Sequence, residues 1–166
     1  MKINPIVAGN WKMNKLPSEG SSFISEISKL VKDIKAVEVI YAPPFTGLFD
    51  LKVKPPFHIA AQNCHWEDCG ALTGEISLTM IKDCGAEYVI LGHSERRHIF
   101  NETDQWVNNK VRAVLRNDLI PILCIGETIE QRENGATKSI LENQLEIGLS
   151  SIEKINKCII AYEPVW

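Results

Sequence analysis

The sequence predicts an α/β fold built on a parallel sheet. Six short apolar runs rich in β-branched residues recur along the 166-residue chain, and none of them alternates cleanly with polar residues. Unbroken apolar runs are typical of strands that are covered by helices on both faces. Helical patterns separate the runs, so the repeated unit is strand, helix, strand.

The six apolar runs are the predicted strands. Each has the length of a strand and is rich in β-branched residues. The runs are Ile6–Ala8, Val37–Ala42, Phe57–Ala61, Tyr88–Leu91, Leu119–Ile125 and Cys158–Tyr162.

Three apolar stripes at helical spacing predict the main helices, and we interpret them as faces that pack on the core. Residues 46–52 and 77–82 are weaker helix candidates. Ser18 or Ser21 is the expected N-cap of the first helix, with Glu19 in its first turn, and Thr103 is the expected N-cap of the second. The stripes are Phe23, Ile24, Ile27, Leu30, Val31 and Ile34; Trp106, Val107, Val111, Val114 and Leu115; and Leu141, Leu145, Leu149 and Ile152.

Composition excludes several classes of protein. The formal charge of −3 lacks the basic excess of a nucleic-acid-binding protein. No apolar run approaches the roughly 20 residues that a membrane helix needs. The apolar stretch within residues 1–9 is too short for a signal peptide, so we expect a cytoplasmic protein.

The cysteines favour free thiols over a metal site. None of the five forms a CxxC pair, and the spacing of Cys64, His65 and Cys69 fits no standard zinc pattern. The five are Cys64, Cys69, Cys84, Cys124 and Cys158.

The chain shows no linker, so we expect residues 1–166 to form a single domain. It also has no GxGxxG or GxxxxGK[ST] loop, which weakens the case for a nucleotide-binding doubly wound sheet. Six βα units suffice for a doubly wound sheet, whereas a (β/α)8 barrel needs eight. Both architectures remain open on this count.

Polar residues gather where the predicted strands end. Asn10 and Lys12 follow the first run, His93 the fourth and Glu163 the sixth, while Gln62-Asn63 and Gly126-Glu127 follow the third and fifth. In a barrel these ends carry the chemistry, and the set offers a cation, a hydrogen-bond donor and a carboxylate base. The alternatives are a surface lysine, a structural histidine and a turn-forming asparagine. Glu163 has no such simple alternative, because it emerges from a buried strand.

The string Gly92–Arg97 predicts a neutral histidine. Ser94 is the expected cap of a short helix whose positive end would disfavour a charged His93 ring. We interpret Arg96 and Arg97 as partners of nearby carboxylates.

Seven strings together give a specific resemblance. In order they are Gly9–Asn14, Ala42–Pro44, Ala61–Asn63, Gly70–Ser77, Ile90–Arg97, Cys124–Glu127 and Ala161–Trp166. Their order and spacing resemble those of the triosephosphate isomerase family along the whole chain. The resemblance implies an α/β TIM barrel, a (β/α)8 fold of which this chain contains about the first six βα units.

The resemblance also implies the reaction, interconversion of dihydroxyacetone phosphate and glyceraldehyde 3-phosphate through an enediolate, as in glycolysis and gluconeogenesis. Glu163 matches the family's base, His93 the neutral electrophile, Lys12 the cation that faces the substrate, and Asn10 the residue that positions Lys12 and substrate oxygens. Ser94, Glu95, Cys124 and Thr73 match supporting positions. No metal or organic cofactor is implied, and neither a nucleic acid nor a membrane is an expected partner.

The loop Gly70–Ser77 resembles the one through which family members form homodimers, with Thr73 near the partner's site. Its alternative is an ordinary surface turn. Leu72 stands where many members have an aromatic residue, which is expected to weaken the contact. Trp11 and Trp166 are expected to be packing or hinge residues.

The family pattern continues beyond Trp166 into a lid, phosphate-binding loops and two further strand–helix units. We therefore expect the 166-residue chain alone to expose the edges of its first and sixth strands, to fold or assemble poorly and to be nearly inactive. The alternatives are that it is an assembly-only fragment or part of a longer enzyme.

Overall fold

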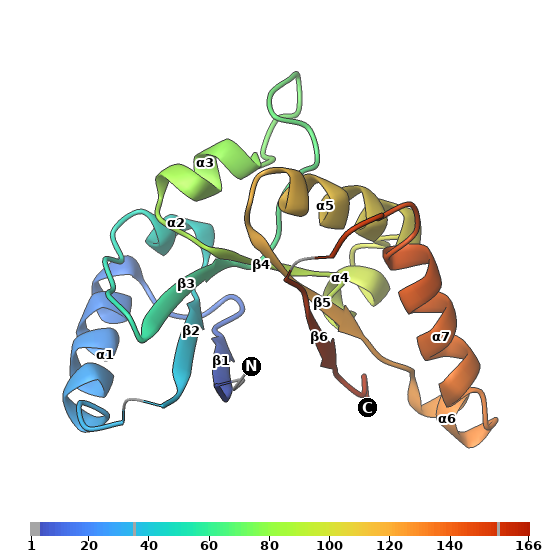
Figure 1. The fold of residues 1–166 in the computed structure, drawn as a ribbon, viewed down its shortest axis with the longest axis horizontal. Coiled ribbons are helices and arrows are strands. Elements are labelled where there is room, and N and C mark those ends of the chain that lie inside the picture. The colour runs from blue at the N-terminus through green and yellow to red at the C-terminus, as the bar shows by residue number, and fades with distance from the viewer. Residues whose placement is uncertain (1–3, 35, 156) are drawn as a thin grey trace. The chain divides into compact units, whose positions relative to one another are not determined.

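A computed structural model describes residues 4–34, 36–155 and 157–166 (Figure 1). Met1, Lys2 and Ile3 of the start segment lie outside these ranges. Six strands alternate with helices and are ordered as they occur in the chain, from β1 to β6. The predicted α/β class is therefore confirmed. The chain divides into two compact units, Met1–Gln62 with Thr79–Tyr88, and Asn63–Leu78 with Val89–Trp166.

The first unit contains the strands β1 (Ile6–Asn10), β2 (Glu38–Ala42) and β3 (Phe57–Ala61), and the helices α1 (Pro17–Leu30) and α2 (Phe45–Leu48). Its strands are parallel, with Asn10 opposite Ala42 and Tyr41 opposite Ile59. Most of helix α3 (Leu78–Asp83) also belongs to it.

The core of the first unit is apolar at the carboxyl ends of β2 and β3. Ile40 and Ile59 are almost fully buried, together with Leu48 of α2. Trp11 meets Phe23 edge to face with ring centroids 5.7 Å apart, which ties the segment after β1 to helix α1. Such aromatic pairs stabilise beyond the area they bury.

The second unit contains the last three residues of β4 (Tyr88–Leu91), and β5 (Ile120–Ile125) and β6 (Ile159–Tyr162), with α4 (Ser94–His98), α5 (Asp104–Arg116), α6 (Ile129–Glu133) and α7 (Thr137–Gly148). β5 and β6 are parallel, with Ile125 opposite Tyr162. Val107, Val111 and Val114 of α5 are fully buried, as the predicted stripe requires. Thr103 caps α5 as expected, because its Oγ1 accepts a hydrogen bond of 3.2 Å from the Trp106 N–H.

Helix α1 differs from its prediction at both ends. Its N-cap is Leu16 rather than Ser18 or Ser21, since Glu19 turns back and accepts the Leu16 N–H at 2.7 Å. The helix ends at Leu30, which is 72% exposed, and Ile34 is 50% exposed. The apolar stripe therefore overstates both the length of the helix and the area that it buries.

Burial also differs between inner and terminal strands. β4 and most of β5 are buried as predicted, whereas Val7 of β1 is 59% exposed and Ile160 of β6 is 43% exposed. β1 and β6 end the strand order and have one neighbouring strand each. The expectation of cover on both faces is thus wrong for these two strands. The family resemblance predicts that their edges are exposed when the chain is alone.

Candidate active site

His93 and Glu163 lie side by side in the second unit. His93 follows β4 and Glu163 follows β6, and the His93 Nε2 is 3.2 Å from the Glu163 Oε1. The His93 side chain is 7% exposed and that of Glu163 is 40% exposed. The donor and the carboxylate that the strand ends predict therefore meet at hydrogen-bond distance, and the Glu163 side chain is partly exposed.

The hydrogen bonds of His93 indicate which ring nitrogen carries the hydrogen. His93 is itself the N-cap of α4, and its Nδ1 accepts the Glu95 N–H at 3.3 Å. The prediction of Ser94 as cap is wrong, because the helix begins at Ser94 and the preceding imidazole takes the capping position. A nitrogen that accepts a backbone N–H carries no hydrogen, so we assign the ring hydrogen to Nε2, which faces Glu163. The Glu95 carboxylate lies 3.4 Å from Nδ1, and its supporting role stays a prediction.

Glu163 is fixed through its main chain rather than through its carboxylate. Its N–H donates to the Ile125 oxygen at 2.8 Å, which extends the β5–β6 pairing by one residue, and the Val165 N–H donates to the Glu127 oxygen at 3.1 Å. The Oε2 atom of Glu163 is buried and meets no hydrogen-bond partner among the described residues. One carboxylate oxygen of Glu163 therefore contacts His93, and the other carries no hydrogen bond from the described residues.

Glu163 lines a small recess together with residues at the ends of β4 and β5. Burial first, and then the Glu163 charge, raise the pKa of the Cys124 thiol to about 12, so this side chain remains a neutral packing group. Ser94, another predicted supporting residue, lines the same recess. The lining residues are Gly92, Ser94, Arg97, Cys124, Ile125, Gly126, Glu163 and Val165.

Arg97 joins the ends of β4 and β5. Its guanidinium donates to the Gly92 oxygen at 2.6 Å and to the Cys124 oxygen at 3.3 Å, and it pairs with Asp104. Gly92 has a φ of +66°, and an added Cβ would lie 2.7 Å from the Arg97 Nη2. Only glycine suits this position, because both the backbone and the guanidinium exclude a side chain. The carboxylate pairing expected for Arg97 is confirmed, as is that of Arg96 with Glu102 at 3.4 Å.

Glu127 is a site residue to which the sequence analysis assigns no role. It is fully buried, and its Oε1 accepts the Tyr162 hydroxyl at 3.0 Å and the Arg132 Nη1 at 3.2 Å. Burial acts to raise the pKa of this carboxyl, but hydrogen bonds from its own backbone, Tyr162, Arg132 and Trp166 hold it below its ordinary value. The Arg132 guanidinium also lies 4.8 Å from the Trp166 ring centroid. Glu127 and Arg132 thus anchor the residues on both sides of Glu163. In the sequence, this role is indicated only by the position of Glu127 at the end of a predicted strand.

Asn10 and Lys12 form a local arrangement in the first unit. The Asn10 Oδ1 accepts the Lys12 N–H at 3.0 Å, and Lys12 has a φ of +54°. Gln62 donates to the Lys12 oxygen at 2.9 Å and to the Ala42 oxygen at 2.8 Å. Asn10 therefore bonds to the Lys12 backbone, and its role in positioning the substrate stays a prediction. The convergence of Lys12 with His93 and Glu163 stays a prediction.

The loop Gly70–Ser77 projects as an extended turn (Figure 1). The Glu75 N–H donates to the Leu72 oxygen at 3.0 Å, and the His65 N–H donates to the Ile76 oxygen at 2.8 Å at the base of the loop. Thr73 is exposed at its tip, and Leu72 is 39% exposed. These exposed positions leave the loop available to a partner, and its role in a dimer stays a prediction.

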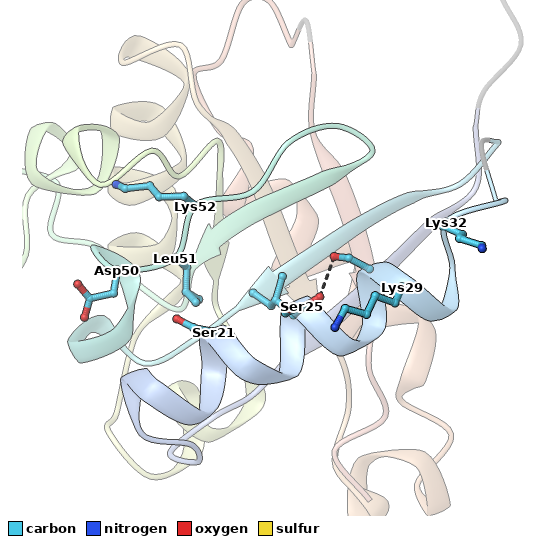
Figure 2. A pocket seen from close by; sticks show the side chains of 9 residues that line it. Ser21, Ser25, Lys29, Lys32, Asp50, Leu51 and Lys52 are labelled. Atoms are coloured by element: carbon cyan, nitrogen blue, oxygen red, sulfur yellow. Dashed lines mark hydrogen bonds between the residues drawn. The ribbon is translucent and has the colours of Figure 1, made fainter.

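A larger groove of about 740 Å³ lies in the first unit between α1 and residues 50–52 (Figure 2). Lys29, Lys32 and Lys52 border it, but their ammonium groups point in different directions (Figure 2). Binding sites for small ligands place a few convergent polar groups in a pocket, which this groove lacks. Within the described ranges no cluster of three histidine, cysteine or carboxylate side chains is suited to a metal ion, and no helix has the length and apolar character needed to cross a membrane.

Comparison with known proteins identifies the family. The model of the family described as triosephosphate isomerase matches residues 5–166. The chain belongs to the triosephosphate isomerase family. It is 47% identical to the triosephosphate isomerase of Alkaliphilus metalliredigens and 50% identical to that of Caldanaerobacter subterraneus subsp. tengcongensis, each over 98% of this chain and 67% of the relative.

A solved structure supports the same family at the level of the fold. The crystal structure of triosephosphate isomerase from Bartonella henselae matches with a TM-score of 0.90 at 40% identity, over 99% of this chain and 69% of that chain. The chain thus spans about two thirds of the length of its relatives in this family. The predicted fold, six βα units of a TIM barrel, is confirmed.

Proposed function

We propose that this chain carries the proton-transfer centre of a triose-phosphate isomerase. The reaction interconverts dihydroxyacetone phosphate and glyceraldehyde 3-phosphate, a step of glycolysis and gluconeogenesis. The observation that carries the proposal is the 3.2 Å contact between the His93 Nε2 and the Glu163 Oε1, with the Glu163 Oε2 buried and unpartnered. An enediolate mechanism needs a hydrogen-bond donor and a base close to each other, and this contact supplies both.

In this mechanism Glu163 removes a proton from the carbon next to the carbonyl. The electron pair left behind forms the enediolate, and the Nε2–H of His93 stabilises the negative charge on the former carbonyl oxygen. The protonated Glu163 then returns the proton to the neighbouring carbon, while His93 moves a proton between the two oxygens. Atoms and charge balance without a cofactor, because the proton that leaves one carbon is delivered to the other.

Lys12 supplies the cation that faces the substrate, and Asn10 holds Lys12 through the 3.0 Å bond to its N–H. Ser94, Glu95 and Cys124 act on the two reacting side chains: Glu95 bonds His93, while Ser94 and Cys124 line the recess beside Glu163. A positioned cation beside a developing oxyanion lowers the barrier without reorganisation.

We further propose that the protein acts in the cytoplasm as a homodimer assembled through the loop Gly70–Ser77, with Thr73 close to the partner's site. The exposed loop tip, held at its base by the His65–Ile76 hydrogen bond, supports this assembly. Sedimentation of the wild-type protein and of a Leu72→Asp variant tests it. A dimer that the substitution dissociates is expected, and a monomeric wild-type protein contradicts the proposal.

The function is tested by replacing Glu163 with aspartate in a full-length enzyme, since the 166-residue chain alone is expected to be nearly inactive, and measuring isomerase turnover. Shortening the base by one methylene withdraws it from the carbon by about 1 Å, so turnover is expected to fall by about 100-fold or more while the thermal midpoint stays unchanged. The matched control is Glu146→Asp on the exposed side of α7, which is expected to keep full turnover. Unchanged turnover in Glu163→Asp excludes Glu163 as the base. A folded wild-type protein without turnover favours the assembly-only alternative.

A further inference from the structure

We propose that Gln144 is a positioning residue for Glu163, acting through the backbone of Gly126. The inference rests on the proposed function in so far as Glu163 is the base. Gln144 belongs to α7, lies far along the chain from both residues, and is only 9% exposed. Gln144 is not part of the apolar stripe of this helix, and helix formation does not require an amide here, so its hydrogen bonds show what the side chain does.

Gln144 binds both polar backbone groups of Gly126. Its Oε1 accepts the Gly126 N–H at 2.9 Å, and its Nε2 donates to the Gly126 oxygen at 3.1 Å. The side-chain amide thus pairs with Gly126 as a neighbouring strand would, just beyond the end of β5. All four atoms are buried, and a buried backbone group without a partner is costly, so the two bonds fix Gly126 in one place.

Gly126 in turn is in close contact with the backbone of Glu163. A Cβ added to Gly126 would lie 1.9 Å from the Glu163 oxygen and 2.9 Å from the Glu163 carbonyl carbon. On the other side, the Glu163 N–H bonds to the Ile125 oxygen at 2.8 Å. The main chain of Glu163 is therefore confined by residues 125 and 126, and Gln144 determines where residue 126 lies.

This arrangement explains how the Glu163 carboxylate can be accurately positioned although its Oε2 has no hydrogen bond within the described part of the chain. Glu163 needs one oxygen available for the proton, so its carboxylate cannot be held by many hydrogen bonds. Positioning it through the backbone, from an amide on a helix packed against β5, leaves that oxygen without a hydrogen bond from the described residues. A residue that only stabilised the fold would have no such effect on the distance between Glu163 and His93.

The experiment is ¹⁵N NMR of the His93 ring in the wild-type protein and in Gln144→Met, which keeps the length of the side chain and removes both hydrogen bonds. Glu163→Gln gives the reference position of the His93 Nε2 signal in a protein without the carboxylate. Asn143→Met is the matched control on the exposed face of α7. The His93 Nε2 signal in Gln144→Met is expected to move toward its position in Glu163→Gln. The control is expected to leave the signal in place.

A kinetic comparison separates positioning from stability. In folded Gln144→Met we expect kcat to fall on the order of 10- to 100-fold with little change in KM, because binding groups are unaffected. If Gln144→Met does not fold, Gln144→Glu replaces it: this side chain retains the acceptor for the Gly126 N–H and loses the donor, so a smaller shift in the same direction is expected. A folded variant whose His93 signal and kcat match the wild type overturns the inference. Because the NMR readout requires no turnover, it distinguishes this failure from that of Glu163 as base.

Discussion

Replacing Gly126 with alanine tests how closely the position of Glu163 depends on its neighbour. The added methyl would lie 1.9 Å from the Glu163 oxygen, whereas a methyl and an oxygen in ordinary contact are about 3.2–3.5 Å apart. One of the two backbones must therefore move by more than about 1 Å. Since Gln144 holds Gly126 through both backbone groups, we expect Glu163 to move.

A displacement of about 1 Å at a catalytic group costs on the order of 100-fold in rate. Isomerase turnover of Gly126→Ala in a full-length enzyme is expected to fall by about that factor, with KM nearly unchanged. The matched control is Gly148→Ala, whose added methyl meets Leu123 at 3.4 Å and whose helical position tolerates alanine. This control is expected to keep wild-type turnover.

Two results would refute the reasoning. Wild-type turnover in a folded Gly126→Ala protein would mean that the contact does not set the place of Glu163. An equal loss of turnover in Gly148→Ala would mean that an added methyl group anywhere in the second unit lowers turnover, so the loss would not be specific to Gly126. Thermal melts of both variants identify the fraction of protein that is folded, so a loss of turnover through unfolding is recognised.

Two further predictions concern buried ionisable groups. Because the pKa of Glu127 is held below its ordinary value of 4.5, its carboxylate stabilises the fold above that pH, and this contribution is lost as the pH falls through the lower folded-state pKa. In urea melts between about pH 7 and pH 3, wild type is expected to lose its advantage over Glu127→Gln; a pH-independent difference contradicts this. Because burial raises the pKa of Cys124 to about 12, its thiol is expected to be inert to a thiol reagent at neutral pH. Cys69→Ser should remove one fast-reacting thiol and Cys124→Ser none, and the reverse pattern would be evidence of an open site.

The strands were predictable because burial on both faces leaves an unbroken apolar signature. β3 and β4 coincide with their predicted runs, and the other strands differ by one or two residues at an end. The terminal strands were predicted in place but not in burial, since a run of apolar residues does not record how many neighbours the strand has. Helix ends were less predictable: Glu19 caps α1 from inside the helix, while serines were available at the expected position.

The reacting residues were predictable from their place at strand ends, and the residues that hold them were not. His93 and Glu163 stand where apolar runs stop, which is a local signal. Gln144 lies on a helix that faces solvent in part, and its partner is the backbone of Gly126, 18 residues away in the sequence. Such long-range pairs have no periodicity in the sequence, so only the folded backbone shows them.

The state of the His93 ring tests the central claim most directly. ¹⁵N NMR of the imidazole at neutral pH distinguishes a hydrogen on Nε2, on Nδ1 or on both. The bond from the Glu95 N–H to Nδ1 predicts a neutral ring with its hydrogen on Nε2, directed at Glu163. A hydrogen on Nδ1, or a doubly protonated ring, would contradict the account, because His93 would then not be the neutral donor that the mechanism requires.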